Sequence, residues 1–290
     1  MKPEDSLGKA SDGRERIGQS SIYRYEEQQI EVTQTVEIVP GEQVAPGQTH
    51  RHLDTCLVRF RLENRDHKPH RLAFRFVLDT FIGGNDGVPF TLPGASGLCD
   101  TCQDFAPPDR IPDFIQALER PNLDNPGTIA HLTLHLGGQL EPPDRVSLGR
   151  WINQFLWPAL VQPHVDWQFP VKPMREDSCV VLYWKEKELP AGEHRELGFA
   201  YGLGHVSSGE GGGKLGLTVG GSFRPGEEFT VTAYVHEPLP RQTVSLELPR
   251  GLTRVDGEAT RNVPSLPDGA ASRNSPVTWK VKAARAGRFN

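Results

Sequence analysis

Two neighbouring segments with strict two-residue alternation constrain the fold of this chain more than any other feature. In "DTCLVRFRLENRDHKPHRLAFRFVLDTF" (residues 54–81), apolar side chains occupy every second position of both halves: Cys56, Val58, Phe60 and Leu62, then Leu72, Phe74, Phe76 and Leu78. Side chains at i and i+2 share one face of a β-strand. The intervening "NRDHKPH" contains the Asn, Asp and Pro residues typical of a reversing loop. The pattern predicts an antiparallel hairpin with one apolar face and one arginine-rich face.

Similar alternation recurs along the chain and predicts an all-β fold. It is found in "IEVTQTVEIV" (30–39), "TIAHLTLHLGG" (128–138), "SCVVLYWKEKEL" (178–189) and "HRELGFAYGLG" (194–204). The 30 Gly and 25 Pro residues divide the chain into short segments. One segment, "IPDFIQALERP" (111–121), instead places apolar residues at i, i+3, i+4 and i+7 and predicts a short helix.

The chain is long enough for two domains, and its composition suggests where they divide. Residues 1–20 carry few large apolar side chains and are predicted to form a disordered tail. Residues 21–206 are predicted to form a large antiparallel β-sandwich. Residues 207–213 read as a Gly/Ser linker. Residues 214–290 are predicted to form a smaller, truncated immunoglobulin-like sandwich that lacks its last strand.

Charge and hydropathy argue against two classes of partner. The formal net charge is −5 and no basic block is present, which argues against nucleic-acid binding. No apolar run reaches the ~18 residues that would predict a membrane-spanning helix. The amino-terminal "MKPEDSLGKASDGRERIGQSS" lacks the apolar centre of a secretory signal, which predicts a cytoplasmic protein if the chain is complete as given.

The irregular stretch "LDTFIGGNDGVPFTLPGASGLCDTC" (78–102) contains the first set of candidate site residues. Oxygen-bearing Asp79, Asn85 and Asp86 could bind calcium, which prefers carboxylate and amide oxygens. The alternative, which the turn-forming Gly residues favour, is that these side chains stabilise turns. Cys99 and Cys102 could be ordinary loop thiols, a local disulfide or half of a zinc site. Since a second Cys pair is missing, the first interpretation is favoured over zinc.

The second set of candidates is aromatic. Trp151, Trp157 and Trp167 fall within one short segment and could form a platform on which a sugar ring stacks, or they could be core residues. His131 and His135 have the i, i+4 spacing of a helical zinc motif, but on a strand these residues lie roughly 13 Å apart. They are therefore predicted to be solvated surface residues. No Gly-x-Ser-x-Gly nucleophile elbow is present and no catalytic set can be assembled, which predicts a protein without enzymatic activity or cofactor.

Four stretches carry a resemblance to a group of known sequences. They are "VRFRLENRDHKPHRLAFRFVLDTFIGGNDGVPFTLPG", "IPDFIQALERPNLDNPGTIAHLTL", "VVLYWKEKELPAGEHRELGFAYGLG" and "LTVGGSFRPGEEFTVTAYV". They resemble uncharacterised bacterial β-sandwich proteins, including planctomycete ones, in which an LDTFIGGNDGVPF-type stretch precedes an immunoglobulin-like domain. The resemblance implies a larger parent protein with a signal or anchor outside this segment, and an extracytoplasmic location. It implies no catalytic residue.

These observations together predict a non-catalytic structural or interaction module of a bacterial cell-envelope protein, which binds protein or glycan partners. One alternative is a carbohydrate-recognising domain, accessory to a glycoside hydrolase, that uses the three Trp residues. The other is a calcium-stabilised adhesin-like domain that uses the loop after residue 78.

Overall fold

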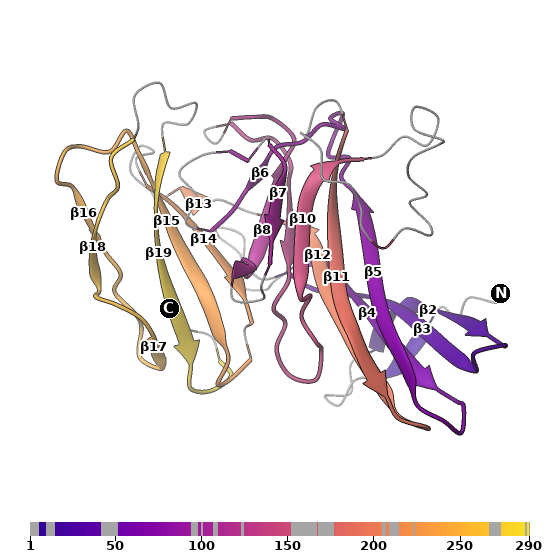
Figure 1. Cartoon of the computed structure of the whole chain (residues 1–290). Coiled ribbons are helices and arrows are strands. Elements are labelled where there is room, and N and C mark those ends of the chain that lie inside the picture. The colour runs from indigo at the N-terminus through magenta and orange to yellow at the C-terminus, as the bar shows by residue number, and fades with distance from the viewer. Residues whose placement is uncertain are drawn as a thin grey trace.

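The structure is a computed structural model, which describes residues 6–9, 15–41, 52–93, 98–99, 101–106, 110–122, 125–151, 167, 177–204, 207–208, 215–222, 224–266, 274–287 and 289. Within these residues every extended regular element is a strand, so the all-β prediction is confirmed. The strands form a large two-sheet sandwich followed by a smaller unit (Figure 1). Among the described residues, no helix is long and apolar enough to span a membrane.

The larger sheet of the sandwich has eight antiparallel strands. Their order across the sheet is β1 (Ser6–Lys9), β2 (Glu15–Tyr25), β3 (Ile30–Pro40), β4 (Leu53–Asn64), β12 (His194–Leu203), β9 (Ile129–Thr133), β8 (Phe114–Leu118) and β6 (Phe90–Thr91). The facing sheet has four strands in the order β5 (His70–Asp79), β11 (Ser178–Leu189), β10 (Arg145–Arg150) and β7 (Gln103–Phe105). Between them lies a core that includes the fully buried Trp184, Leu182, Leu148 and Phe199.

The strands β4 and β5 exist as predicted, but the prediction that they pair as a hairpin is wrong. β4 pairs with β3 and β12, whereas β5 pairs with β11 in the other sheet. Their apolar faces meet across the sandwich instead, with the rings of Phe60 and Phe74 4.5 Å apart between centroids. Stacking two apolar faces removes both from water, whereas pairing side by side would leave both exposed to it.

The predicted helix over 111–118 is also wrong, because Phe114–Leu118 is strand β8, which pairs with β9 and β6. All five of its residues are buried. Ile115 and Ala117 belong to the sandwich core, while Phe114 faces the second unit. A strand buried on both faces carries apolar residues at adjacent positions and can therefore imitate helical spacing.

The predicted disordered tail is contradicted where the structure describes it. Residues 6–9 form β1 and residues 15–20 begin β2, which pairs with β3 along its length. The guanidinium of Arg16 lies 2.6 Å from the Glu37 carboxylate and holds β2 to β3. Backbone pairing with an existing sheet orders this segment despite its polar composition, because pairing satisfies peptide groups irrespective of side chain.

The second unit is built on a five-stranded sheet in the order β13 (Ser207–Ser208), β14 (Leu215–Gly221), β15 (Glu228–His236), β19 (Asn274–Ala283) and β17 (Leu252–Arg254). A two-stranded sheet, β16 (Thr243–Ser245) with β18 (Thr260–Asn262), completes it. Its own core surrounds the buried Trp279. The predicted linker begins with strand residues, since Ser207 and Ser208 pair with β14; residues 209–213 lie outside the described part.

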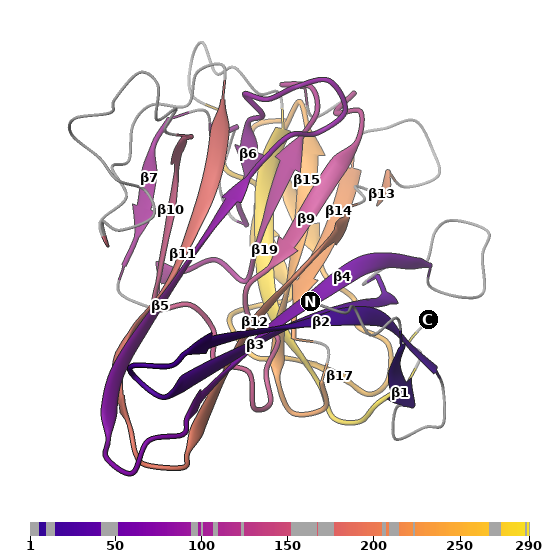
Figure 2. The ribbon, with the colours of Figure 1, turned by 90° about the vertical axis from the view of Figure 1, so that its right-hand side faces the viewer.

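The two units pack closely: they stand side by side in Figure 1 and one behind the other in Figure 2, and β14, β15 and β19 contact Phe114 and Asp113 at the start of β8. A Cβ added at Gly220 would lie 2.3 Å from the Phe114 ring, so only glycine allows this approach. The Ser222 hydroxyl donates to the carbonyl of Leu136 at 3.1 Å. The domain interface therefore covers a face that sequence alternation had assigned to solvent.

The histidines on that face are accordingly not the solvated residues predicted. His131 is only 6% exposed, stacks on Phe114 with 4.7 Å between ring centroids, and lies 3.3 Å from the Gln116 amide nitrogen. His135 is partly buried, with Nδ1 3.3 Å from a carboxylate oxygen of Asp113. The second unit covers them, and the alternation pattern does not reveal that it packs against this face.

An ion pair links the two units, between the buried Asp113 carboxylate and the partly exposed Lys280 side chain. The carboxylate of Asp113 accepts hydrogen bonds from Lys280 of β19 and Thr230 of β15. Burial alone would raise the pKa of Asp113, but contacts with His135, Lys280 and Thr230 outweigh burial and lower it to about 2. Asp113 is therefore ionised and joins the two domains.

Candidate functional site

An aromatic groove opens where the eight-stranded sheet extends past the four-stranded sheet. β5 stacks on β4, so β2 and β3 project beyond the facing sheet (Figure 1). The uncovered inner face and the flank of β5 enclose a volume of about 490 Å³. We call this the β2–β5 groove; it is lined by Tyr23, Tyr25, Gln28, Ile30, Val32, Gln34, Phe60, Leu62 and residues 70–76 except Arg75.

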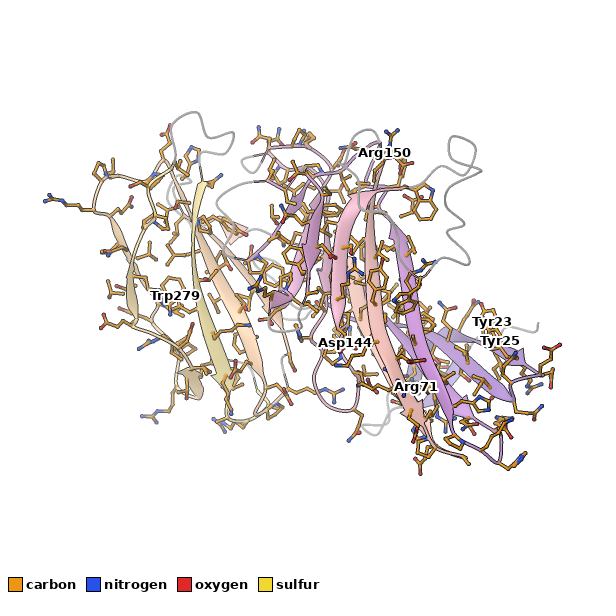
Figure 3. All side chains as sticks on the ribbon, viewed as in Figure 1. Tyr23, Tyr25, Arg71, Asp144, Arg150 and Trp279 are labelled. Carbon is orange, nitrogen blue, oxygen red and sulfur yellow. The ribbon has the colours of Figure 1, made fainter. Side chains whose placement is uncertain are left out.

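The groove has a buried apolar floor and exposed tyrosine side chains at its rim. Phe60 and Leu62 of β4 are buried beneath it, whereas Tyr23 and Tyr25 of β2 remain 44% and 55% exposed. Figure 3 shows these tyrosines and Arg71 at the same end of the molecule. Exposed tyrosines present an apolar ring and a polar hydroxyl, a combination enriched at binding surfaces. The volume falls within the roughly 300–1,000 Å³ usual for ligand sites.

The β5 wall of the groove is held in place by a buried arginine. Arg195 of β12 is only 5% exposed and donates to the carbonyls of Leu72 at 2.7 Å and Lys185 at 3.3 Å. Its guanidinium also lies 3.0 Å from the Glu141 carboxylate. These bonds lie beside a register shift in β11 between Trp184 and Lys187, opposite Phe74 and Leu72. The wall is thus preformed.

A second feature is a cluster of three carboxylates at the far end of β5. Oxygen atoms of Asp79, Asp86 and Asp177 lie within 4.8 Å of one another. Backbone bonds bring the three segments together: Ser178 N donates to Asp86 O at 2.8 Å, and Thr80 N donates to Ser178 O at 3.1 Å. The Thr80 hydroxyl adds a 2.7 Å bond to the same carbonyl of Ser178.

Mutual repulsion and burial shift the pKa values in this cluster. Burial, followed by the charges of Asp86 and Asp79, raises the pKa of Asp177 to about 6, although Arg150 opposes the shift. Burial and Asp86 also raise the pKa of Asp79. One Asp177 oxygen is buried without a hydrogen-bond partner. Three carboxylates at this separation can bind a proton or a hard cation.

The structure separates the predicted calcium ligands. Asp79 and Asp86 come together as expected, but the Asn85 side chain does not join them. Its amide nitrogen donates to Glu119 O at 2.8 Å and its oxygen accepts from Gly87 N at 3.0 Å. Asn85 therefore stabilises a turn, as the alternative interpretation predicted. The third carboxylate of the cluster is that of Asp177.

The tryptophan platform stays a prediction, because only two of its three residues are among those described. Trp167 is 38% exposed and stands edge-on to Tyr183, with 5.5 Å between ring centroids. Trp151 is partly buried against Cys179 and Val181 on the outer face of β11. Trp157 lies outside the described residues. A pocket of about 450 Å³ lies beside Trp167, lined by Ala73, Asp144, Arg145, Trp167, Tyr183, Lys185 and Glu186.

The predicted cysteine pair is not a disulfide in this structure, because Cys99 and Cys102 are both free thiols. Cys99 is buried, and its sulfur donates to the carbonyl of Thr101 at 3.3 Å. Its backbone forms a bridge to Phe90, with bonds of 2.7 and 2.9 Å. Cys99 therefore fills core space in this loop.

Comparison with known proteins adds little to this description. No protein-family model matches the chain, and no curated protein matches it. Among solved structures, the chain is similar to the crystal structure of the Slr1438 protein from Synechocystis sp. PCC 6803, with a TM-score of 0.40 and 7% identity over 70% of this chain. The chain spans 66% of the length of that protein. At this TM-score the likeness carries no inference.

The sequence analysis did not single out the tyrosines of the groove or the third carboxylate of the cluster, Asp177. Tyr23 and Tyr25 alternate in "IYRY", a strand signal that could have placed both rings on one face. Asp177 had no comparable signal, because only the pairing of β5 with β11 brings it to Asp79.

Proposed function

We propose that this chain is a non-catalytic interaction module and that the β2–β5 groove is its binding site. The observation that carries the proposal is the preformed aromatic groove, with an apolar floor of Phe60 and Leu62 and two half-exposed tyrosines at its lip. Such a site gains binding energy by removing apolar surface from water, and its tyrosines lose little entropy on binding.

The proposed setting is a bacterial cell envelope, with the chain placed outside the cytoplasm. The resemblance of the 58–94 stretch to bacterial β-sandwich proteins supports this setting. In such a protein the chain would serve as a structural or interaction domain, with protein or glycan partners.

Peptide and glycan arrays probed with the purified chain test the proposal. A Gln34→Trp variant fills the floor of the groove, since Gln34 lines it. Thr33→Trp is the matched control, because the preceding residue of β3 points to the opposite face. We expect ligands that bind the wild type and Thr33→Trp but not Gln34→Trp. If binding to every ligand survives Gln34→Trp, or if no ligand binds, the proposal is wrong.

Glycan recognition beside Trp167 is the second candidate function. It is favoured by the pocket on the outer face of β11, where the exposed Trp167 ring lies among Asp144, Arg145 and Glu186. Polar groups around an aromatic ring match the alternating polar and apolar surfaces of a sugar. Glycan binding that is lost in Trp167→Ala and retained in Gln34→Trp would select this candidate over the groove.

A further inference from the structure

The strand β5 ends the four-stranded sheet, with β11 as its one paired neighbour. It is ten residues long, and in the described part of the chain no strand pairs with its other edge. An open edge of this kind presents peptide N–H and C=O groups that can pair with another chain. The β2–β5 groove lies directly alongside this edge, because residues 70–74 line it.

The inner face of β5 is incompletely covered. Leu72, Phe74 and Phe76 point into the sandwich, yet all three are only partly buried, in contrast to the fully buried Leu182 and Trp184 of β11. On the opposite side of the groove, Tyr25 and the other groove residues of β2 and β3 face no strand among the described residues. Neighbouring strands of a sheet lie about 4.8 Å apart. A further strand paired with the free edge of β5 would therefore lie in the β2–β5 groove.

The outer face of β5 is positively charged, which favours acidic residues on a strand that adds to its free edge. Arg71 and Arg75 alternate with Ala73 along this face, and the Arg71 side chain is 64% exposed although it contacts Glu186. Residues opposite each other on adjacent strands interact, and opposite charges stabilise the pair. A partner strand with acidic residues on its outer face therefore complements β5. A second copy of β5 would instead place four arginines on one face.

Building on the proposed function, we propose that the β2–β5 groove binds an extended peptide segment that adds as a strand to the edge of β5. The segment alternates apolar residues, which enter the groove between Tyr25 and Phe74, with acidic residues, which lie beside Arg71 and Arg75. Backbone hydrogen bonds to β5 supply affinity and the alternation supplies specificity.

A synthetic peptide of ten residues, alternating Val or Leu with Glu or Asp and carrying a fluorophore, tests the inference by fluorescence anisotropy. In a β-strand the N–H groups of alternate residues point to opposite edges. N-methylation of one set of alternate residues should weaken binding about tenfold or more, because several hydrogen bonds are lost. N-methylation of the other set should change the affinity less than about twofold. If both sets weaken binding equally, or neither does, the inference is wrong.

Charge reversal supplies an independent measurement. The Arg71→Glu, Arg75→Glu variant should prefer a peptide with Lys at the acidic positions, whereas the wild type prefers the acidic peptide. Arg71→Glu alone should show the same change in smaller degree. An unchanged preference in either variant that retains the wild-type melting transition would contradict the charge assignment.

Two outcomes separate this inference from the proposed function, and a third supports both. An array ligand that requires the groove but is not an extended peptide leaves the proposed function standing and overturns the strand inference. Concentration-dependent dimers in light scattering, without peptide binding, would identify a second copy as the occupant and also overturn it. Loss of peptide binding in Gln34→Trp but not in Thr33→Trp supports both.

Discussion

Replacing Asp113 with Asn removes the charge that links the two units while keeping the shape of the side chain. The pKa of Asp113, about 2, lies about 1.8 below the ordinary 3.8. Each pKa unit corresponds to about 1.4 kcal/mol, so ionisation of Asp113 stabilises the folded chain by roughly 2–3 kcal/mol. Because the folded pKa is lowered, this stabilisation is present above about pH 4 and is lost as the pH falls towards 2.

Urea unfolding at two pH values measures this contribution. At about pH 7 we expect Asp113→Asn to be less stable than the wild type by roughly 2–3 kcal/mol, and near pH 2 we expect the two proteins to converge. Lys280→Gln should cost a similar amount, and the double variant should cost little more than either, since all three break one interaction. Asp104→Asn is the control, because its ion pair with Arg145 is half exposed and should contribute less than about 1 kcal/mol. Equal stability of Asp113→Asn and the wild type at neutral pH would refute the reasoning.

Three further predictions concern the carboxylate cluster and the groove wall. Asp177, whose folded pKa is raised to about 6, favours folding below about pH 4 and loses that contribution as the pH rises through 6. Asp177→Asn should therefore raise stability at about pH 7.5 by about 1 kcal/mol, a value reduced for solvent screening; a less stable variant in urea unfolding would contradict this. Calcium at about 1 mM should raise the melting temperature of the wild type but not of Asp86→Ala, and an unchanged wild-type transition would remove calcium from the cluster. Arg195→Gln should lower the free energy of unfolding by about 2 kcal/mol, because it removes the guanidinium bonds to the carbonyls of Leu72 and Lys185 and leaves Lys187 to pair with Glu141; a loss below about 0.5 kcal/mol would show that water replaces the guanidinium.

Local alternation predicted individual strands well. The predicted ranges 30–39, 178–189 and 194–204 agree closely with β3, β11 and β12. These elements were visible because apolar residues at every second position can share one buried face only in extended backbone. The same argument placed strands over β4 and β5, although not their partners.

Only the tertiary structure showed which strands pair with, or stack on, one another. Alternation shows that a strand has one apolar face, but not which strands pair along its edges and which strand stacks on that face, so the sequence could not show that Phe60 meets Phe74 across the sandwich. The polar face of β9 read as solvent-exposed because threonine and histidine occur on both exposed and interfacial faces. Its burial depends on the second domain, whose approach at Gly220 no local pattern encodes.

The residues of the candidate sites were also predicted only in part from the sequence. The sequence by itself placed Asp79 and Asp86 in one Gly-rich loop, because residues close along the chain must be close in space. Only the pairing of β5 with β11 added Asp177, and only the unequal widths of the two sheets opened the β2–β5 groove. Periodicity determined which side chains share a face of a strand. The strand order determined which of those faces are covered, because burial depends on neighbours distant in the chain.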